Sequence, residues 1–240
     1  MVEPNMKDAA KVEVASKPKR EYRTYLFWLG LMAVTGAFTT LTILVKTTPS
    51  FLIDVQITHA LQSLGSPFFS GLMIVISWPG FAPQAIGVSA LIVLAVYMFG
   101  FHWEAVAAVF AAILPQAINM LVKEWIQRPR PTIDLVEVFR ILDSYSFPSG
   151  HVMFYVGFFG FLWFLAYTLL KQSWLRTFLL LLLGTFIALV GISRISLGQH
   201  WASDVLGAYL LGSLTLVVNI WFYRWGKKRF FLRQPVAPEP

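Results

Sequence analysis

The chain contains no cysteine, and only 13% of its 240 residues are charged. A soluble domain carries about a quarter charged residues, and the absence of cysteine excludes disulfide scaffolds, thiol catalysis and cysteine-ligated zinc. Hydrophobic residues make up 57% of the chain, which excludes a disordered protein as well. The composition therefore predicts an integral membrane protein. In such a protein the net charge of +7 indicates basic cytoplasmic flanks rather than a nucleic-acid partner.

Six uncharged apolar runs are each long enough for a membrane-spanning helix, which needs about 17–25 residues. They cover residues 25–45, 84–100, 105–122, 152–170, 177–193 and 205–223. Because backbone polar groups in lipid must be hydrogen-bonded internally, these runs predict helices. A shorter apolar stretch, residues 66–77, is broken by Trp78-Pro79-Gly80 and predicts an interfacial or re-entrant helix before the second span. The expected fold is an all-α bundle of six transmembrane helices.

Polar segments flank this bundle at both ends of the chain. Residues 1–24 contain six basic residues and two prolines and predict a flexible tail, and residues 227–240 predict a second tail that is basic and proline-rich. A single membrane domain, residues 25–226, is expected between them. The sequence contains no regular repeat and no second soluble domain.

The distribution of lysine and arginine sets the expected orientation. Thirteen of the 19 basic residues lie in the two tails and in the link between the fourth and fifth runs, and six lie on the opposite side. The positive-inside rule therefore predicts that both termini are cytoplasmic. Compact loops, the absence of cysteine and the absence of Asn-x-Ser/Thr sequons favour a bacterial cytoplasmic (inner) membrane.

Five of the six basic residues on the other side lie in only two loops, against the bias that sets the topology. The first loop opens with Lys123 and reaches Arg130, followed by Pro131, seven residues later. A compact ammonium and a planar guanidinium together suit a tetrahedral oxyanion such as phosphate. Taken alone, this cluster is also compatible with basic anchors at the end of a membrane helix.

The same loop ends with Pro148-Ser149-Gly150-His151, directly before the fourth apolar run. Free N–H groups and the positive end of the helix dipole at that point can bind an anion, and Gly150 allows an oxyanion to approach the backbone. Ser149 is also placed to cap the helix. His151 alone is compatible with either a structural or a catalytic role.

The second loop begins with Ser193-Arg194 and ends with His200 and Asp204, at the start of the sixth run. If the last helix begins near Gln199, the carboxylate of Asp204 lies one turn from His200 and can hold one imidazole N–H. The other ring nitrogen is then free to act as base or nucleophile. An isolated pair of this kind is equally compatible with a surface hydrogen bond.

The order of the spans brings these motifs to one membrane face. Lys123 ends the third run, His151 starts the fourth, Arg194 follows the fifth and His200 starts the sixth. A set of phosphate-binding residues with two histidines, one of them oriented by a carboxylate, predicts a phosphoryl-transfer site.

Together the motifs Lys-x6-Arg-Pro, Pro-Ser-Gly-His and Ser-Arg-x5-His-x3-Asp resemble the three signatures of the type 2 phosphatidic acid phosphatase (PAP2) family. The resemblance covers roughly residues 66–223. It implies that His200 is the nucleophile, that Asp204 orients it and that His151 is the general acid. The residues that the resemblance assigns to phosphate binding are Lys123, Arg130, Ser149, Gly150 and Arg194.

The resemblance also implies a lipid phosphatase that needs neither a metal nor another cofactor, and the outer loops hold no dense carboxylate cluster for magnesium. The candidate substrates are undecaprenyl pyrophosphate or its monophosphate, phosphatidylglycerol phosphate, phosphatidic acid and a lipid A phosphate. The expected partners are this lipid and the membrane, with no nucleic acid and no obligatory protein partner. Two alternatives are a lipid-to-lipid phosphotransferase and a non-catalytic membrane scaffold or transporter.

Overall fold

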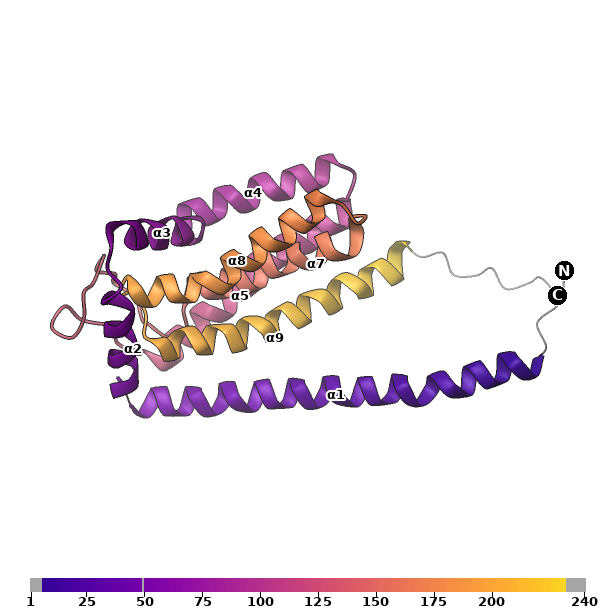
Figure 1. Ribbon diagram of the computed structural model, residues 1–240, viewed down its shortest axis with the longest axis horizontal. Helices are drawn as coiled ribbons and strands as arrows, with labels where there is room; N and C mark the ends of the chain where they lie inside the picture. The colour runs from indigo at the N-terminus through magenta and orange to yellow at the C-terminus, as the bar shows by residue number, and fades with distance from the viewer. Residues whose placement is uncertain (1–5, 49, 232–240) are drawn as a thin grey trace.

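The computed structural model describes residues 6–48 and 50–231, with side chains from Glu21 onward, and these residues form helices and no strands (Figure 1). In chain order the elements are α1 (Met6–Thr47), α2 (Leu52–Gln62), α3 (Pro67–Ser77), the 3₁₀ turn η1 (Trp78–Gly80), α4 (Ala82–Met98), α5 (His102–Ile126), α6 (Gly150–Phe154), the π-helical turn η2 (Tyr155–Phe159), α7 (Gly160–Leu169), α8 (Trp174–Ser196), α9 (Ala202–Gly226) and η3 (Lys227–Phe231).

Five helices in the described part of the chain are long and apolar enough to cross a membrane. They are Glu21–Thr47 within α1, α5, the continuous helix Gly150–Leu169, α8, and α9 extended to Phe231. Each contains one of the six predicted runs. The remaining run forms α4, which is apolar but only 17 residues long. The expected all-α membrane fold is confirmed.

The second predicted span is preceded by α3, the short helix expected at residues 66–77. Ser66 caps α3, because its Oγ accepts a hydrogen bond from the Phe69 N–H (3.1 Å), and Pro67 stands in the first turn, where its missing N–H is not needed. Pro79 lies in the 3₁₀ turn that ends the helix. Figure 1 shows α3 at the end of α4, so the two helices follow one another along the side of the bundle.

Helix α2 is not predicted by the sequence, because its eleven residues are too few for a span and include polar side chains such as Asp54 and His59. It lies across one end of the bundle (Figure 1), and its axis makes an angle of 117° with the helix Pro67–Gly80. The side chains of Asp54 and Thr58, one turn apart, are both buried. α2 thus covers this end of the bundle with a polar face turned inward.

The two ends of the bundle carry different elements. The link between α7 and α8 and the end of α9 lie at one end, which we call the inner end, and the first part of α1 projects beyond it (Figure 1). At the opposite end, the outer end, lie α2, the loop between α5 and α6, and the turn between α8 and α9. Lys123, His151, Arg194 and His200 are all at the outer end, as the order of the spans predicts.

Both predicted tails are partly helical. α1 begins at Met6 and therefore includes most of the segment 1–24 that was expected to be flexible, and η3 continues the last helix to Phe231, past the expected boundary at residue 226. Lysine, glutamate, alanine and arginine are frequent in residues 6–24, and these residue types favour a helix even without an apolar face. Residues 1–5 and 232–240 of the two tails lie outside the described residues.

The centre of the bundle is the helix Gly150–Leu169, which packs on α5, α8 and α9. In its most apolar stretch of 18 residues, 67% of the residues are buried, compared with 39% or less in the other candidate spans. Its π-helical turn contains Gly157, which lies against Pro115 of α5 so closely that a Cβ would collide with the proline ring. This contact holds the central helix, and the motif at its N-terminus, tightly against α5.

Candidate active site

Backbone hydrogen bonds connect the sequence motifs at the outer end. α5 ends with Gln127 in the left-handed conformation (φ 56°), and the chain then crosses the outer end before α6. In this loop the Ser146 N–H donates to the Arg128 carbonyl (2.8 Å), and the Ser149 N–H donates to the carbonyl of Asp204 in α9 (3.3 Å). The three motifs therefore form one site although up to 81 residues separate them in the sequence.

His200 lies in the turn between α8 and α9 and is almost completely buried. Its Nε2 is 3.3 Å from Nη1 of Arg130. Because a guanidinium can only donate, Nε2 accepts this hydrogen bond, and the ring proton is assigned to Nδ1. Nδ1 faces Ser146 Oγ at 3.4 Å and Asp204 Oδ2 at 3.6 Å. Burial, together with the charges of Arg130 and Lys123, lowers the pKa of His200 well below its ordinary value.

Asp204 is held in the first turn of α9 by hydrogen bonds to both of its carboxylate oxygens. Its Oδ2 accepts from the Trp201 N–H (2.9 Å) and from Ser146 Oγ (2.5 Å), and its Oδ1 accepts from Nη1 of Arg128 (2.5 Å). The predicted i, i+4 placement next to His200 is present, but the 3.6 Å separation exceeds a direct hydrogen bond. Ser146 lies within hydrogen-bond distance of both groups and links them.

Arg130 and Lys123 are held by oxygen atoms of the neighbouring loops. Arg130 donates from Nε to the Ser144 carbonyl (2.7 Å), from Nη2 to Ser144 Oγ (2.9 Å) and from Nη1 to the Gln199 carbonyl (2.6 Å). Lys123 Nζ donates to the Tyr145 carbonyl and to the Ser146 carbonyl (3.3 Å). These bonds fix the positions of both charged groups, and both residues bond to the segment 144–146.

Arg194 is 1% exposed at the C-terminal end of α8. Nη1 donates to Ser77 Oγ (3.1 Å), Nη2 donates to Gln199 Oε1 (3.3 Å), and the guanidinium lies 5.7 Å from the centre of the Phe81 ring. Ser77 in turn is hydrogen-bonded to Ser193 Oγ (2.6 Å). Ser77 of α3 and Phe81, directly after η1, therefore position Arg194, although they precede it by more than 100 residues.

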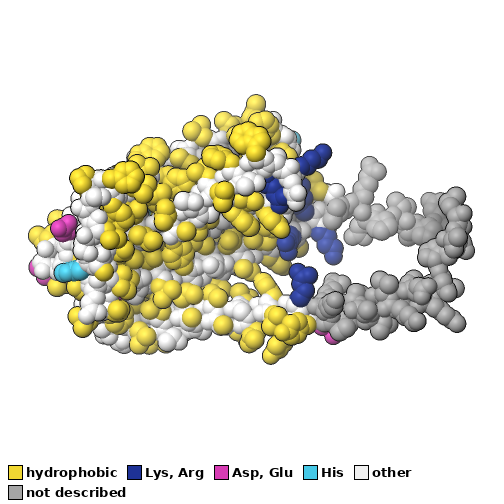
Figure 2. All heavy atoms as spheres, viewed as in Figure 1, with side chains coloured by type: hydrophobic (Ala, Val, Ile, Leu, Met, Phe, Trp, Pro, Cys, Tyr) yellow, Lys and Arg dark blue, Asp and Glu magenta, His cyan; other side chains and the backbone are white. Residues whose placement is uncertain are grey.

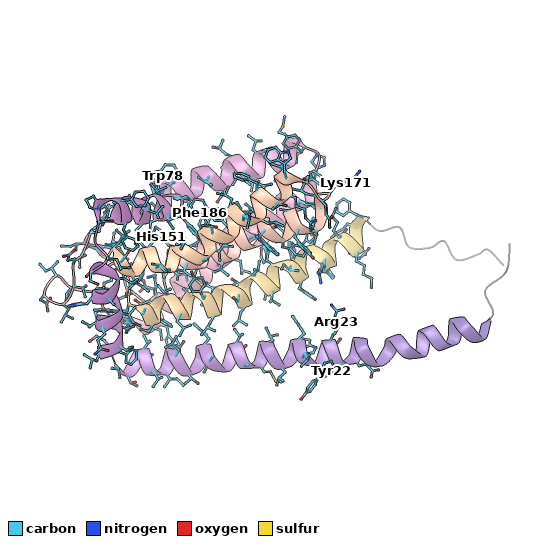
Figure 3. The ribbon with its side chains drawn as sticks, viewed as in Figure 1. Tyr22, Arg23, Trp78, His151, Lys171 and Phe186 are labelled. Carbon is cyan, nitrogen blue, oxygen red and sulfur yellow. The ribbon has the colours of Figure 1, made fainter. Side chains whose placement is uncertain are left out.

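His151 lies at the start of the central helix, close to η1 (Figure 3). The Phe81 ring meets the imidazole edge-on at 5.0 Å, and a Cβ at Gly80 would collide with the imidazole. Ser149 stands at the N-cap position but makes no capping hydrogen bond with its side chain. Within the described residues, three buried polar atoms around this region have no hydrogen-bond partner: Ser149 Oγ, His151 Nε2 and Arg194 Nε. Each of these atoms can donate a hydrogen bond to a phosphate oxygen, His151 when its Nε2 carries a proton.

The loop Pro148–His151 is attached to α5 by two amides. Asn119 Nδ2 donates to the Pro148 carbonyl (2.9 Å), and Gln116 Nε2 donates to the Gly150 carbonyl (3.1 Å). A Cβ at Gly150 would point at the Asn119 side chain, with a closest approach of 3.4 Å. The missing side chain of Gly150 therefore faces α5, and the contribution of this residue to anion binding comes from its backbone.

Four basic residues meet at the outer end, and only one of them is neutralised. Arg128 forms ion pairs with Asp54 (2.8 Å) and with Asp204 (2.5 Å). Across the described part of the chain, no carboxylate lies within ion-pair distance of Lys123, Arg130 or Arg194. Three basic residues without a carboxylate partner, next to an imidazole nitrogen that carries no proton, form an arrangement that can bind an anion.

Comparison with known proteins agrees with this geometry. The family model described as PAP2 superfamily matches residues 104–230, which is more than half of the chain. Phosphatidylglycerophosphatase B of Bacillus subtilis (strain 168) is 30% identical over 166 residues, covering 67% of this chain and 78% of that protein. The chain belongs to the PAP2 superfamily. As a PAP2 protein it is a membrane phosphatase, a phosphoric monoester hydrolase.

Solved PAP2 structures have the same arrangement of helices. The crystal structure of a transmembrane PAP2-type phosphatidylglycerolphosphate phosphatase from Bacillus subtilis superposes with a TM-score of 0.72 at 25% identity, covering 85% of this chain and 98% of that one. LpxE of Aquifex aeolicus superposes with a TM-score of 0.58 at 18% identity, over 71% of this chain and 96% of that one, and supports the fold alone.

The PAP2 signatures do not include every residue that builds this site. Arg128 belongs to the same Arg-Pro-Arg-Pro segment as Arg130 but falls outside the Lys-x6-Arg-Pro signature, and the sequence does not show which carboxylates it meets. Asp54 precedes the region that matches the family model, and its only signal is a single carboxylate in a segment of mixed polarity outside the spans. Ser146 and Asn119 have no recognisable signal, because hydroxyls and amides are common at the ends of membrane helices.

Proposed function

We propose that this PAP2 phosphatase removes the terminal phosphate from a phosphomonoester or pyrophosphate of a membrane lipid, through a phosphohistidine formed at His200 Nε2. The observation that carries the proposal is the arrangement of Lys123, Arg130 and Arg194, three cations without carboxylate partners, at a histidine whose Nε2 accepts from Arg130. This nitrogen has the lone pair that an attack on phosphorus requires.

In the first step the phosphate is bound by the three cations, with the Ser149 hydroxyl and the Gly150 N–H as further donors. His200 Nε2 attacks the phosphorus, and the bond from phosphorus to the lipid oxygen breaks. His151 gives its proton to that oxygen, so the lipid leaves as an alcohol or, from a pyrophosphate, as a monophosphate. Positive charge that develops on the His200 ring is stabilised by Asp204 through Ser146 and across the 3.6 Å gap.

In the second step water replaces the lipid. The now neutral His151 accepts a proton from this water, whose oxygen attacks the phosphorus, and the bond between phosphorus and His200 Nε2 breaks. Inorganic phosphate leaves, and both histidines return to their initial protonation states. None of these steps uses a metal ion, so we expect activity to persist in EDTA.

The substrate class follows from the apolar helices that surround the site and from the relatives. Phosphatidylglycerol phosphate is the first candidate, because phosphatidylglycerophosphatase B of Bacillus subtilis is 30% identical to this chain. Undecaprenyl pyrophosphate, its monophosphate, phosphatidic acid and lipid A phosphates share the phosphate that the site would bind. Phosphate release by the purified protein in detergent with EDTA, measured over this panel, tests the proposal. Phosphorylated acceptor lipid without free phosphate would indicate a phosphotransferase instead, and no reaction with any lipid would indicate a non-catalytic protein.

We further propose that the inner end of the bundle is cytoplasmic and that the site opens on the extracytoplasmic face of the inner membrane. The positive-inside rule supports this orientation, with 13 basic residues on one side and six on the other. A reporter that is active only outside the cytoplasm is expected to be silent after Pro240 and active between Arg130 and Tyr145. An active fusion after Pro240 would contradict the orientation.

A further inference from the structure

A second buried carboxylate lies behind Asp204. Asp54 of α2 is 1% exposed and accepts from Nη2 of Arg128 (2.8 Å), while Nη1 of the same guanidinium donates to Asp204 (2.5 Å). Ser203 completes the cluster: its N–H donates to Asp54 Oδ1 (2.9 Å), and its Oγ donates to Asp54 Oδ2 (2.6 Å) and accepts from Arg128 (2.7 Å). Asp54, Arg128 and Asp204 therefore form a chain of alternating charge from α2 to the site.

This chain fixes the Asp204 carboxylate in one rotation. Arg128 occupies Oδ1, so Oδ2 is left to Ser146 and the Trp201 N–H and faces Nδ1 of His200. A guanidinium is planar and presents its two outer nitrogens at a fixed spacing, which sets the distance between the two carboxylates that it joins. Lysine offers one charge at a single point and cannot replace this geometry.

We propose that Asp54 and Arg128 are positioning residues for the phosphoryl-transfer reaction: they hold Asp204, and through it the imidazole of His200, in the orientation for attack. The inference deepens the proposed function and depends on the role of His200 given there. Arg128 differs from the phosphate-binding residues because two carboxylates already neutralise its charge. α2, which lies outside the region that matches the PAP2 model, completes the site by supplying Asp54.

A misplacement of about 1 Å at a reacting group can cost on the order of a hundredfold in rate. We therefore expect Asp54→Asn and Arg128→Lys each to lower kcat by about ten- to a hundredfold, with KM changed by less than about threefold because the three uncompensated cations are untouched. In an Asp204→Asn background the same substitutions are expected to cost less than about threefold more, because the residue that they position is already lost.

The experiment measures phosphate release from phosphatidylglycerol phosphate, or from whichever panel lipid the wild type hydrolyses fastest, with each variant purified in detergent. Thermal unfolding is measured on the same samples, and rates are taken well below every melting temperature. Glu104→Gln is the matched control. Glu104 is a third buried acid with a basic partner, Lys227 at 2.7 Å, but it lies at the inner end. The Glu104→Gln variant is expected to be less stable than the wild type, with an unchanged kcat.

The outcomes separate the two proposals. Wild-type kcat in Asp54→Asn, full additivity with Asp204→Asn, or an equal loss of kcat in Glu104→Gln would overturn the positioning role. Wild-type activity in His200→Ala would instead overturn the proposed function. If Asp54→Asn and Arg128→Lys do not fold, Ser203→Ala decides the matter, because it removes a hydrogen bond from Asp54 without leaving a buried charge unpaired. Its expected loss in kcat is about three- to tenfold, and an unchanged kcat would overturn the inference.

Discussion

The two ends of the bundle differ in how much charge they bury. At the outer end Arg128, Arg194, His200 and Asp204 are all buried. At the inner end the basic side chains of Lys171, Arg224, Lys228 and Arg229 are exposed, and Figure 2 shows basic side chains gathered there beside the apolar surface. Exposed charges orient a membrane protein at little cost, whereas buried charges are expensive unless they are paired or used. The comparison supports the proposal that the active site lies at the outer end.

The inner end has one exception to this contrast. Glu104 is buried and accepts from Lys227 Nζ (2.7 Å) and from Tyr223 OH (3.0 Å). Trp103 next to it donates from its indole nitrogen to the Tyr223 carbonyl (2.9 Å) and contacts the rings of Phe222 and Phe231. This buried pair closes the packing of α5 against the end of α9. The contrast between a structural and a reactive buried charge can therefore be tested within one chain.

The largest effect is expected at the histidines of the outer end. His200→Ala should abolish turnover, a loss of at least about ten thousandfold, together with any acid-stable or base-stable covalent phospho-enzyme. His151→Ala should retain part of the activity towards p-nitrophenyl phosphate if the site admits it, because its leaving oxygen needs little protonation. Quenching with labelled substrate measures the covalent intermediate. Label that stays on the His200→Ala protein would reverse the two assignments.

A smaller loss is expected from Arg194→Lys, which keeps the positive charge of the outer end and removes the planar donor. The ammonium cannot hold Ser77, Gln199 and a phosphate oxygen in the same geometry. The expected fall in kcat/KM is about ten- to a thousandfold, the range seen when one donor to a developing charge is lost. Near-normal kinetics would show that Arg194, like the basic residues of the inner end, serves topology. Orthovanadate, a mimic of the five-coordinate phosphoryl group, should inhibit the wild type.

The pH dependence tests the electrostatics of the same end. Burial and the charges of Arg130, Lys123 and Arg194 lower the pKa of His200, with Asp204 as the one facing carboxylate. The neutral, attacking form therefore predominates above this lowered pKa, and kcat/KM should fall on acidification only below about pH 6.5. Lys123→Met removes one cation and should move this acidic limb to higher pH than in the wild type. If kcat/KM of Lys123→Met falls at the same acidic pH as in the wild type, Lys123 does not act on His200.

The smallest catalytic effect is expected at the inner end. Glu104→Gln removes the acceptor of Lys227 and should cost about 1–2 kcal/mol of stability, since the lysine is partly exposed and can be hydrated instead. The melting temperature in detergent should fall by a few degrees, while kcat and KM stay within about twofold of wild type. Reduced kcat at unchanged stability would break the contrast between the two ends.

Much of the fold and of the site could be predicted because both rest on short-range patterns. Six uncharged runs reveal helices whatever their partners are, and the order of the spans places Lys123 and His200 at one end. α2 was not predicted because its eleven residues, apolar and polar, are too few to span a membrane and show no clear amphipathic pattern. The helical part of the N-terminal tail escaped because polarity alone does not distinguish a solvated helix from a flexible chain.

The sequence by itself determined that this protein spans a membrane, that its signature residues meet at one end and that they suit a phosphate. Only the tertiary structure showed that Arg128 is neutralised by two carboxylates while Arg130 has no carboxylate partner. The difference depends on Asp54, 74 residues before Arg128, and therefore on the way α2 packs across the outer end. Whether a charge is neutralised depends on its distance from an opposite charge in the folded protein. A sequence motif gives the residue types but not these distances.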